Sequence, residues 1–584
     1  MALLDRINAP EDLKKFSPGE MTKLAEEIRK GILKRVNTLG GHLGPDLGIV
    51  EATIALHYVF NSPTDKFVFD VSHQCYPHKM LTGRKDGFVN PAGHSEISGY
   101  FNPAESEHDT FVIGHTSTSV SLATGVAKAR DLKGEKHNVI ALIGDGSLSG
   151  GEAYEGLNNA SVLGSNIIII VNDNEMSIAE NQGGLYKNLE LLRKTHGKAE
   201  LNFFKTFGFD YYYVENGNDI QTLIEAFKKV KDTDKPTVVH IHTLKGKGYA
   251  PAVENKELGH WMTAGFMDEK ENSSDKFSES YESITNKYIS EKQKEDKTIM
   301  LISPATPGAT AFGQEFRKSL GKNYTDVGIA EEHAIAYSSA LAKNGCKPVL
   351  GILSSFVQRT YDQLSQDLAL NNSPAAILVY WGGISPMDMT HLGCFDIPLI
   401  SNIPNIVYLA PTCKEEYIRM LDWAVNQTEY PAAIRVPFGS FRVSGKEDTT
   451  DYSILNKSEL VHSGSKVAIL GLGSFFELGL KLADKLKETL KIDATVINPK
   501  FISGIDKELL AGLEKNHEVV ITLEDGILNG GFGEKVAGFL GKTSMKVLNY
   551  GADKEFTDRV PLDELYKRYR LVPELIVEDI RNIL

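Results

Sequence analysis

The sequence has few cysteines, and this shortage excludes two classes of protein. Only 4 cysteines occur among 584 residues. Because they are widely separated and form no C-x-x-C pair, they indicate neither a disulfide framework nor a thiolate metal site. We expect buried, inert thiols at Cys75, Cys346, Cys394 and Cys413.

Long apolar runs and basic segments are also lacking. No stretch of about 18 apolar residues occurs, so no membrane-spanning helix is expected. The first 16 residues carry Asp, Glu and Lys and lack the apolar core of a signal peptide, which predicts a cytoplasmic protein without a membrane partner. A net charge of −14 with no basic stripe argues against nucleic acid as a partner.

What the chain does contain is the ordinary composition of a large globular protein, 41% hydrophobic and 24% charged. A chain of 584 residues is too long for one hydrophobic core. Short apolar runs alternate with helical patterns, as expected of parallel strands covered by helices on both faces. The predicted strands are 139–143, 167–171, 375–379, 406–410, 466–470 and 518–522.

Two polar stretches divide this pattern into three parts. They are 268–297, which includes a predicted helix over 278–292, and 445–458. No short repeat is present, which excludes solenoid folds. The predicted fold class is therefore α/β, with three successive α/β domains of mostly parallel sheets, at 1–295, 296–456 and 457–584.

The strongest local motif follows two of the predicted strands. Gly144-Asp145-Gly146 comes directly after strand 139–143, and Asn174 follows strand 167–171. The ends of neighbouring parallel strands bind phosphates, because backbone N–H groups and helix dipoles point there. Asp145 and Asn174 would supply the oxygen ligands that Mg²⁺ prefers when it bridges a diphosphate.

Simpler interpretations of these glycine-rich segments remain open. Gly-Asp-Gly alone fits an ordinary turn, and Asn172-Asp-Asn174 alone fits a helix cap. A nicotinamide-binding site is a rival, with Gly471-Leu-Gly473 as its candidate. That segment lacks a third glycine and a suitable downstream acid, so a strand-to-helix turn explains it adequately.

Beyond this motif, segments along nearly the whole chain resemble the 1-deoxy-D-xylulose-5-phosphate synthase family of the transketolase superfamily. Ordinary transketolases share the diphosphate motif, but Tyr76–Lys79 and Gln358–Gln363 resemble the synthases more. The resemblance implies a diphosphate- and Mg-binding domain, a pyrimidine-binding domain and a transketolase C-terminal domain, in that order. The similar segments are 40–48, 70–84, 114–119, 172–177, 245–251, 328–333 and 355–363.

The family resemblance implies a thiamine-diphosphate-dependent transferase with Mg²⁺ as second cofactor. Such an enzyme decarboxylates pyruvate and joins the two-carbon unit to glyceraldehyde 3-phosphate, for isoprenoid, thiamine and pyridoxal synthesis. The family forms homodimers. Its metal ligands correspond to Asp145, Asn174 and the main-chain carbonyl of Met176.

The same resemblance assigns the remaining site residues. Glu331 would hydrogen-bond the aminopyrimidine ring of the cofactor, although a glutamate there also fits a surface helix. Arg359 would meet a substrate carboxylate or phosphate, although a surface ion pair also fits it. The cofactor-binding positions are His73, Gly114, His115, Ser117, Gly144, Asp145, Gly146, Ser147, Asn174, Met176, Lys245, Glu331 and Phe356, and the catalytic or substrate-contacting positions are His42, His73, His260, Asp388, His391, Glu331 and Arg359.

The predicted acceptor pocket departs from the family pattern. Where the family has two arginines that hold the acceptor phosphate, this chain has Trp381 and Phe438, and a family tyrosine is Leu353. The loop 385–391 is shorter by one residue, so Asp388 aligns ambiguously. Losing two charge-assisted contacts at roughly 1.5 to 3 kcal/mol each would weaken phosphate binding by a few orders of magnitude.

Three functional hypotheses follow from this departure. The family's own reaction is retained if Arg435, Arg442 or Arg359 swings in to bind the phosphate. Alternatively, the acceptor is an unphosphorylated or more apolar aldehyde. The third hypothesis is a non-catalytic relative that binds the cofactor, against which the intact Asp145, Asn174 and Glu331 speak.

Overall fold

The computed structural model describes residues 2–268, 279–310, 312–439 and 441–584. The chain forms two compact units. The first is built from residues before 269 together with Gly328–Ala330, and the second from the other residues after 278. Among the described residues, none of the helices combines the length and apolar character needed to cross a bilayer.

The first unit is organised around a five-stranded sheet whose strands are all parallel. Two of its central strands are those predicted at 139–143 and 167–171. In spatial order the strands are β2 (Lys66–Phe69), β3 (Val139–Gly144), β4 (Ile167–Asp173), β6 (Pro236–His242) and β5 (Asp210–Val214).

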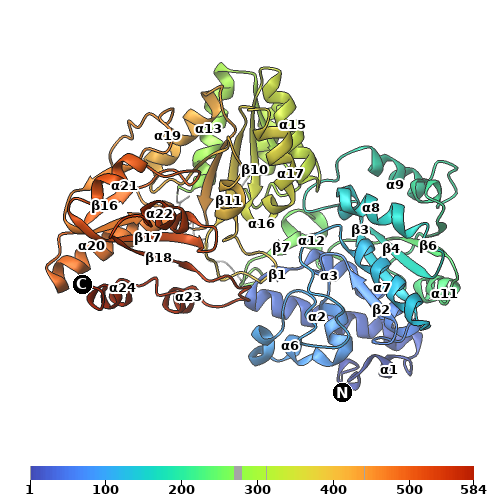
Figure 1. Cartoon of the computed structure of the whole chain (residues 1–584). Helices are drawn as coiled ribbons and strands as arrows, with labels where there is room; N and C mark the ends of the chain where they lie inside the picture. The colour runs from blue at the N-terminus through green and yellow to red at the C-terminus, as the bar shows by residue number, and fades with distance from the viewer. Residues whose placement is uncertain (1, 269–278, 311, 440) are drawn as a thin grey trace. The chain divides into compact units, whose positions relative to one another are not determined.

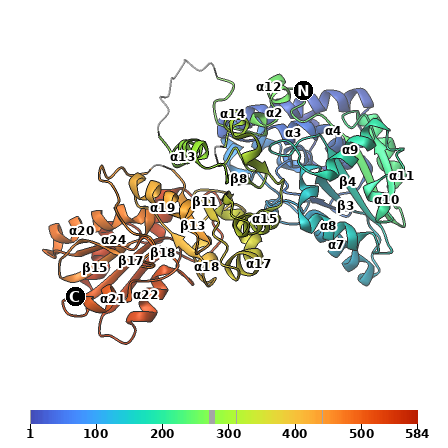
Figure 2. The ribbon, with the colours of Figure 1, turned by 90° about the horizontal axis from the view of Figure 1, so that it is seen from above.

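Apolar residues of this sheet alternate between two hydrophobic cores. Ile168 and Ile170 of β4 face a core shared with α2 (Pro18–Leu39), α4 (Val50–Val59) and α11 (Ile220–Val230). Ile167 and Ile169 face a second core formed with α7 (Ser119–Lys133), α8 (Gly151–Ala160) and α9 (Gly184–Lys194). Figure 2 shows α7 and α8 on one side of β3 and β4 and α4 on the other. Covering both faces explains why these strands are continuously apolar.

A short two-stranded sheet lies beside α2 in the first unit. Helix α2 begins with a capping box between Ser17 and Glu20 and ends at Gly40, whose φ of 75° favours glycine. The chain then enters β1 (Gly41–His42), which pairs antiparallel with β7 (Trp261–Met262). This pairing brings His42 beside the segment that contains His260, far away in the sequence.

The second unit contains a six-stranded, fully parallel sheet. Helices α13 (Tyr281–Glu295) and α19 (Lys414–Asn426) cover one face, and α15 (Glu331–Lys343) covers the other, as Figure 1 shows around β10 and β11. In spatial order the strands are β12 (Val407–Leu409), β13 (Ala432–Pro437), β11 (Ala376–Gly382), β10 (Lys347–Leu353), β8 (Ile299–Ser303) and β9 (Tyr324–Asp326).

A second sheet, of five strands, completes the second unit. It is parallel except for the antiparallel edge strand β14. Helices α20 (Phe476–Leu490) and α24 (Pro573–Arg581) pack on one face, and α21 (Lys507–Leu513) and α22 (Phe532–Leu540) on the other. The strands are β14 (Glu459–His462), β16 (Thr495–Asn498), β15 (Lys466–Gly471), β17 (His517–Ile527) and β18 (Lys546–Ala552).

The predicted fold class is confirmed, since three mostly parallel α/β sheets follow one another along the chain. Each sheet lies within one predicted domain, while the boundaries after 295 and 456 stay predictions. The helix predicted over 278–292 is α13, which starts after its N-cap Ser280; residue 278 lies outside the described residues. The four cysteines are free, but the expectation of burial is wrong for Cys346, which is partly exposed.

Candidate active site

The ends of β3 and β4 lie side by side in the first unit. Gly144 pairs with Asn172 in the parallel register, and the backbone N–H of Asp145 donates to the Asn172 carbonyl at 3.1 Å. The polar residues that follow each strand therefore meet at one edge of the sheet. Asp145 and Asn174, distant in sequence, are brought together there.

The Asp145 carboxyl is buried at this edge of the sheet. Its Oδ2 accepts hydrogen bonds from the backbone N–H of Met176 at 3.1 Å and from Asn181 Nδ2 at 2.6 Å. Burial, together with the neighbouring Asp173 carboxylate, raises the pKa of Asp145 to about 7. Protein hydrogen bonds alone thus compensate incompletely for removing this carboxylate from water.

The Asn174 side chain adds an unsatisfied oxygen to this buried carboxyl. Among the described residues, its buried Oδ1 has no hydrogen-bond donor, an arrangement that costs about 1 to 3 kcal/mol. A buried carboxylate beside an orphaned amide oxygen fits a hard cation such as Mg²⁺. No group of three His, Cys, Asp or Glu in the described part of the chain could hold a metal, so remaining ligands would come from carbonyls and the diphosphate. Met176 was predicted to offer its carbonyl here.

Steric constraints explain the glycine after Asp145. A Cβ on Gly146 would lie 3.0 Å from the Cα of Ser177, whereas a Cβ on Gly144 meets nothing within 4 Å. The hydroxyl of Ser117, a predicted diphosphate contact, donates to the Ser147 carbonyl at 2.8 Å. Ser117 therefore supports the loop after Asp145 through its side chain. The predicted neighbours Gly114 and His115 precede Ser117 in the same loop.

Three of the four predicted catalytic histidines cluster in the first unit. The ring centroids of His42 and His73 are 4.9 Å apart, and that of His260 lies 5.3 Å from His42 and 5.4 Å from His73. Burial lowers the pKa of His42 and of His260 well below the usual value, so both rings are neutral at pH 7. The fold thus brings three predicted catalytic histidines together from distant parts of the sequence.

Lys245 connects the histidine cluster with the loop after Asn174. Its Nζ donates to the Ser177 carbonyl at 2.6 Å and lies 3.0 Å from Nδ1 of His260. Burial lowers the pKa of Lys245 to about 7, although nearby Asp145 opposes the shift. An added anion would stabilise the charged form of this ammonium group, as the predicted diphosphate role requires.

The structure also reveals site residues that the motifs did not indicate. Asn181 donates to Asp145, and the Tyr186 hydroxyl donates to the carbonyls of Asp145 and Gly146 at 3.2 Å each. Lys256 donates to the Asn174 carbonyl at 3.0 Å. These residues lie outside the matched segments, so only their position shortly after a strand end could have suggested them.

In the second unit, Glu331 is the first residue of α15. Its side chain is buried, with only 4% of the residue exposed, so the surface-helix alternative is wrong. Burial raises the pKa of Glu331 to about 7, although Arg359 lowers it in part. Oε2 accepts no hydrogen bond from the described residues and lies 3.8 Å from Nη1 of Arg359. Glu331 thus combines a readily protonated carboxyl with an available acceptor.

The other predicted residues of the second unit lie around the strand ends of its parallel sheet. Phe356, in α16 (Ser354–Val357) after β10, contacts His391 with ring centroids 5.7 Å apart. The backbone N–H of His391 donates to the Asp388 carbonyl, and the Asp388 carboxylate pairs with Arg559 at 3.7 Å. The shortened loop is therefore held by the C-terminal part of this unit.

The two aromatic replacements in the acceptor segments contact each other. Trp381 and Phe438, at the ends of neighbouring strands β11 and β13, have ring centroids 5.7 Å apart in an edge-to-face arrangement. Arg435 is buried and bound to the carboxylates of Asp396 and Asp525. The hypothesis that Arg435 swings in to hold a phosphate is therefore wrong, because it would abandon two buried anions.

Known proteins are similar to this chain over nearly its whole length. The sequence model of 1-deoxy-D-xylulose-5-phosphate synthase matches 4–202 and 192–243, that of the transketolase pyrimidine-binding domain 279–442, and that of the transketolase C-terminal domain 456–576. The 1-deoxy-D-xylulose-5-phosphate synthase of Clostridium beijerinckii is 38% identical, with 98% of each chain covered. That of Caldanaerobacter subterraneus is 37% identical, with 99% of this chain and 98% of the relative covered. A transketolase structure from Campylobacter jejuni, 17% identical, has a TM-score of 0.45 over 96% of this chain and 99% of the other.

Replacing Asn174 by leucine should affect folding and binding in opposite directions. Leucine has a similar shape and removes the orphaned oxygen, so the free protein should melt at the same or a higher temperature. Affinity for thiamine diphosphate with Mg²⁺, measured by calorimetry, should fall at least about tenfold because a hard oxygen ligand is lost. Asn158→Leu, on the exposed face of α8, is the control. Wild-type affinity in Asn174→Leu would exclude Asn174 as a ligand.

The buried Glu331 should make the stability of the cofactor-free protein depend on pH. Its pKa of about 7 lies above the ordinary 4.5, so the folded state binds an extra proton between these values. Stability should therefore fall as pH rises through this window, by up to ~3 kcal/mol. Glu331→Gln lacks this titrating group. The melting temperature of the variant should therefore rise relative to that of the wild type as the pH increases from 4.5 to 8. A melting-temperature difference between Glu331→Gln and the wild type that stays constant with pH would contradict this account.

Proposed function

Because the chain belongs to the 1-deoxy-D-xylulose-5-phosphate synthase family, we propose that it is a carboligase that decarboxylates pyruvate and joins the two-carbon unit to an aldehyde. By the family's reaction the aldehyde is glyceraldehyde 3-phosphate and the product is 1-deoxy-D-xylulose 5-phosphate. Members are transferases that use thiamine diphosphate with a divalent metal. The observation that carries the proposal is the orphaned Asn174 oxygen beside the buried Asp145 carboxyl.

When bound, thiamine diphosphate supplies an electron sink that accepts the electron pair left as carbon dioxide departs. Asp145, Asn174 and the Met176 carbonyl would hold Mg²⁺ against the diphosphate. Lys245, whose ammonium group is destabilised by burial, would pair with the diphosphate anion and regain its ordinary protonation. Each of these residues acts by binding, and none exchanges a proton with substrate.

Glu331 would act on the aminopyrimidine part of the cofactor. A carboxyl with a pKa of about 7 holds or releases a proton readily at neutral pH. Its Oε2 has no donor among the described residues, so it can hydrogen-bond a ring nitrogen, while the ring of Phe356 supplies an apolar contact. Arg359 both counters the Glu331 charge and offers its guanidinium to a substrate carboxylate.

The histidine cluster would move protons at the substrate oxygens. His42, His73 and His260 converge, and neutral imidazoles can both accept and donate a proton. His391 and Asp388 would contribute from the loop of the second unit. The homodimeric assembly is proposed from the family resemblance, and the cytoplasmic location is proposed from the composition of the sequence.

A second candidate acceptor, an unphosphorylated or more apolar aldehyde, is favoured by the environment of Trp381. Trp381 and Phe438 pack together where arginines were expected, and the buried Arg435 is committed to Asp396 and Asp525. Arg442 lies over the Phe476 ring, with its guanidinium carbon 5.4 Å from the centroid. The ends of β11 and β13 thus present apolar rings in place of a charge-assisted phosphate site.

Carbon dioxide release from pyruvate tests the proposed reaction. The purified protein with thiamine diphosphate and Mg²⁺ should release carbon dioxide, and an aldehyde should accelerate it. Glu331→Ala should lower turnover at least about 100-fold, because a positioned proton-transfer group is lost. Glu332→Ala serves as the neighbouring control. If no pyruvate condition yields carbon dioxide while the cofactor binds, the chain is a non-catalytic relative or uses another donor.

The acceptor preference can be measured as a ratio of kcat/KM values. The second candidate predicts that glyceraldehyde 3-phosphate and glyceraldehyde differ by less than about tenfold in kcat/KM, because Trp381 and Phe438 stand where the family has phosphate-binding arginines. Trp381→Arg should raise the ratio for the phosphorylated aldehyde about tenfold or more, since one charge-assisted contact is worth roughly 1.5 to 3 kcal/mol. Trp381→Leu controls for loss of the ring. A wild-type preference for the phosphorylated aldehyde above about 100-fold would reject the second candidate.

A further inference from the structure

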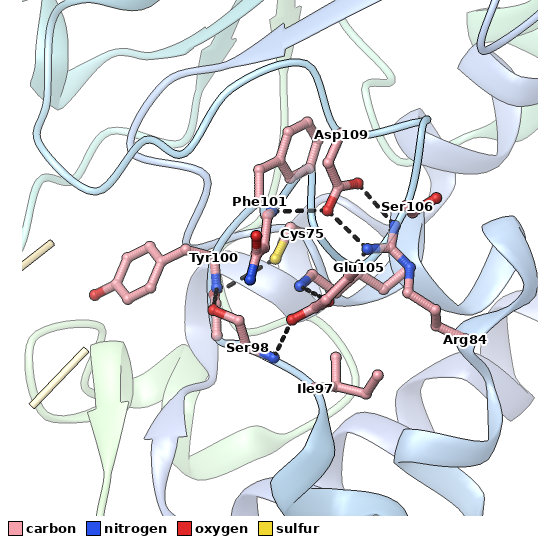
Figure 3. Close-up of polar contacts among 12 residues, drawn as sticks. Cys75, Arg84, Ile97, Ser98, Tyr100, Phe101, Glu105, Ser106 and Asp109 are labelled. Carbon is pink, nitrogen blue, oxygen red and sulfur yellow. Dashed lines mark hydrogen bonds and ion pairs between the residues drawn. The ribbon is translucent and has the colours of Figure 1, made fainter. Parts of the chain in front are cut away.

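A buried network of charged side chains lies in the first unit, apart from the residues assigned above. Its cations are Lys79 and Arg84 and its anions are Glu105 and Asp109. Arg84 binds both oxygens of Asp109 at 2.7 Å each, and Lys79 binds Glu105 at 2.7 Å. His78 lies 3.0 Å from Asp109. Figure 3 shows Arg84 beside the carboxylates of Glu105 and Asp109. We call these four charged residues the loop network.

The two carboxylates of the loop network fold the segment 98–109 back on itself. Glu105 accepts the backbone N–H of Ser98 at 2.7 Å, and Asp109 accepts that of Asn102 at 2.9 Å. Although burial opposes it, hydrogen bonds from Arg84 and His78 lower the pKa of Asp109 far below its usual range. Asp109 is therefore a charged acceptor at neutral pH.

Further hydrogen bonds fix the backbone between these two points. The Cys75 thiol donates to the Gly99 carbonyl at 3.4 Å, and the Phe101 N–H donates to the Ser72 hydroxyl at 2.9 Å. The N–H of Tyr100 donates to the Ser98 hydroxyl at 3.2 Å. Each residue from Ser98 to Asn102 is thus held through its backbone. The Tyr100 side chain points away from the loop network, as Figure 3 shows.

The Tyr100 ring meets the histidine cluster. Tyr100 is buried, and its ring centroid lies 5.9 Å from that of His42 in an edge-to-face arrangement. Among the described residues, the His42 side chain has ring contacts with Tyr100, His73 and His260 and makes no hydrogen bond. An imidazole without a hydrogen-bonding partner depends on packing for its orientation. Of the described rings that contact His42, Tyr100 is the one that is not a histidine.

We propose that Tyr100 is a positioning residue that fixes the orientation of the His42 ring, and that Glu105 and Asp109 hold Tyr100 in place for this purpose. The kinetic part rests on the proposed function, in which His42 moves a proton at the substrate. This positioning role gives a reason for the four charged residues of the loop network. A buried charge is costly unless paired, and here the pairs tie the Tyr100 loop to the segment that follows His73.

A double-mutant cycle tests whether Tyr100 acts through His42. Tyr100→Ala should lower kcat by about tenfold or more while KM for pyruvate and the affinity for thiamine diphosphate change less than about threefold. Tyr100→Phe retains the ring and should keep kcat within about threefold, and it also covers the case in which Tyr100→Ala fails to fold. In a His42→Ala background, Tyr100→Ala should change kcat less than about twofold. Multiplicative losses, or wild-type kcat in Tyr100→Ala, would overturn the proposal.

Hydrogen exchange tests the role of the loop network without substrate. In the full-length free protein, Glu105→Ala should speed amide exchange in 98–102 at least about tenfold, because Ser98 loses its acceptor and Lys79 its counterion. Glu105→Gln, which retains an acceptor, should show a smaller increase, and the exposed neighbour Glu107→Ala should show none. Equal exchange in Glu105→Ala and Glu107→Ala would overturn the positioning role. Because the hydrogen-exchange measurement needs no turnover, its outcome is separate from any failure of the carboligase reaction.

Discussion

The site depends on two parallel strands, β3 and β4, that end side by side and bury a carboxyl with a raised pKa beside an amide oxygen without a donor. Asp145 is buried with a raised pKa, and the Asn174 oxygen receives no hydrogen bond from the described residues. Both deficits carry a free-energy cost in the cofactor-free protein. A divalent cation would remove both deficits at once. The fold therefore maintains a locally unfavourable arrangement that binding would relieve.

The same principle recurs at Lys245 and Glu331. Burial drives the pKa of each group to about 7, in opposite directions from their ordinary values. An anion near Lys245 would stabilise its ionised form, and a ring nitrogen near Glu331 would accept a hydrogen bond from its protonated form. By contrast, Arg435 and the cations of the loop network bind buried carboxylates. The ionised forms of Lys245 and Glu331 are thus destabilised where cofactor contacts are expected, whereas buried ion pairs support the segments that carry the site.

Much of this could be predicted from sequence because it depends on local patterns. Apolar runs predicted β3, β4 and β15, and the motifs after β3 and β4 predicted that Asp145 and Asn174 meet, since consecutive parallel strands here are neighbours. The contacts that sequence could not supply depend on packing between distant segments. Nothing near Arg435 reveals that Asp396 and Asp525 enclose it, and nothing near Glu105 reveals that it binds Lys79 and caps Ser98. Side-chain partners of this kind are set by tertiary structure.

The central claim is that the oxygens after β3 and β4 hold a divalent metal together with the cofactor diphosphate. Anomalous diffraction from crystals grown with thiamine diphosphate and Mn²⁺, a substitute that scatters anomalously, tests it most directly. The account predicts one anomalous peak at bonding distance from a carboxylate oxygen of Asp145, Oδ1 of Asn174 and the Met176 carbonyl. Bound cofactor with no peak there, or with the metal held by other residues, would contradict it.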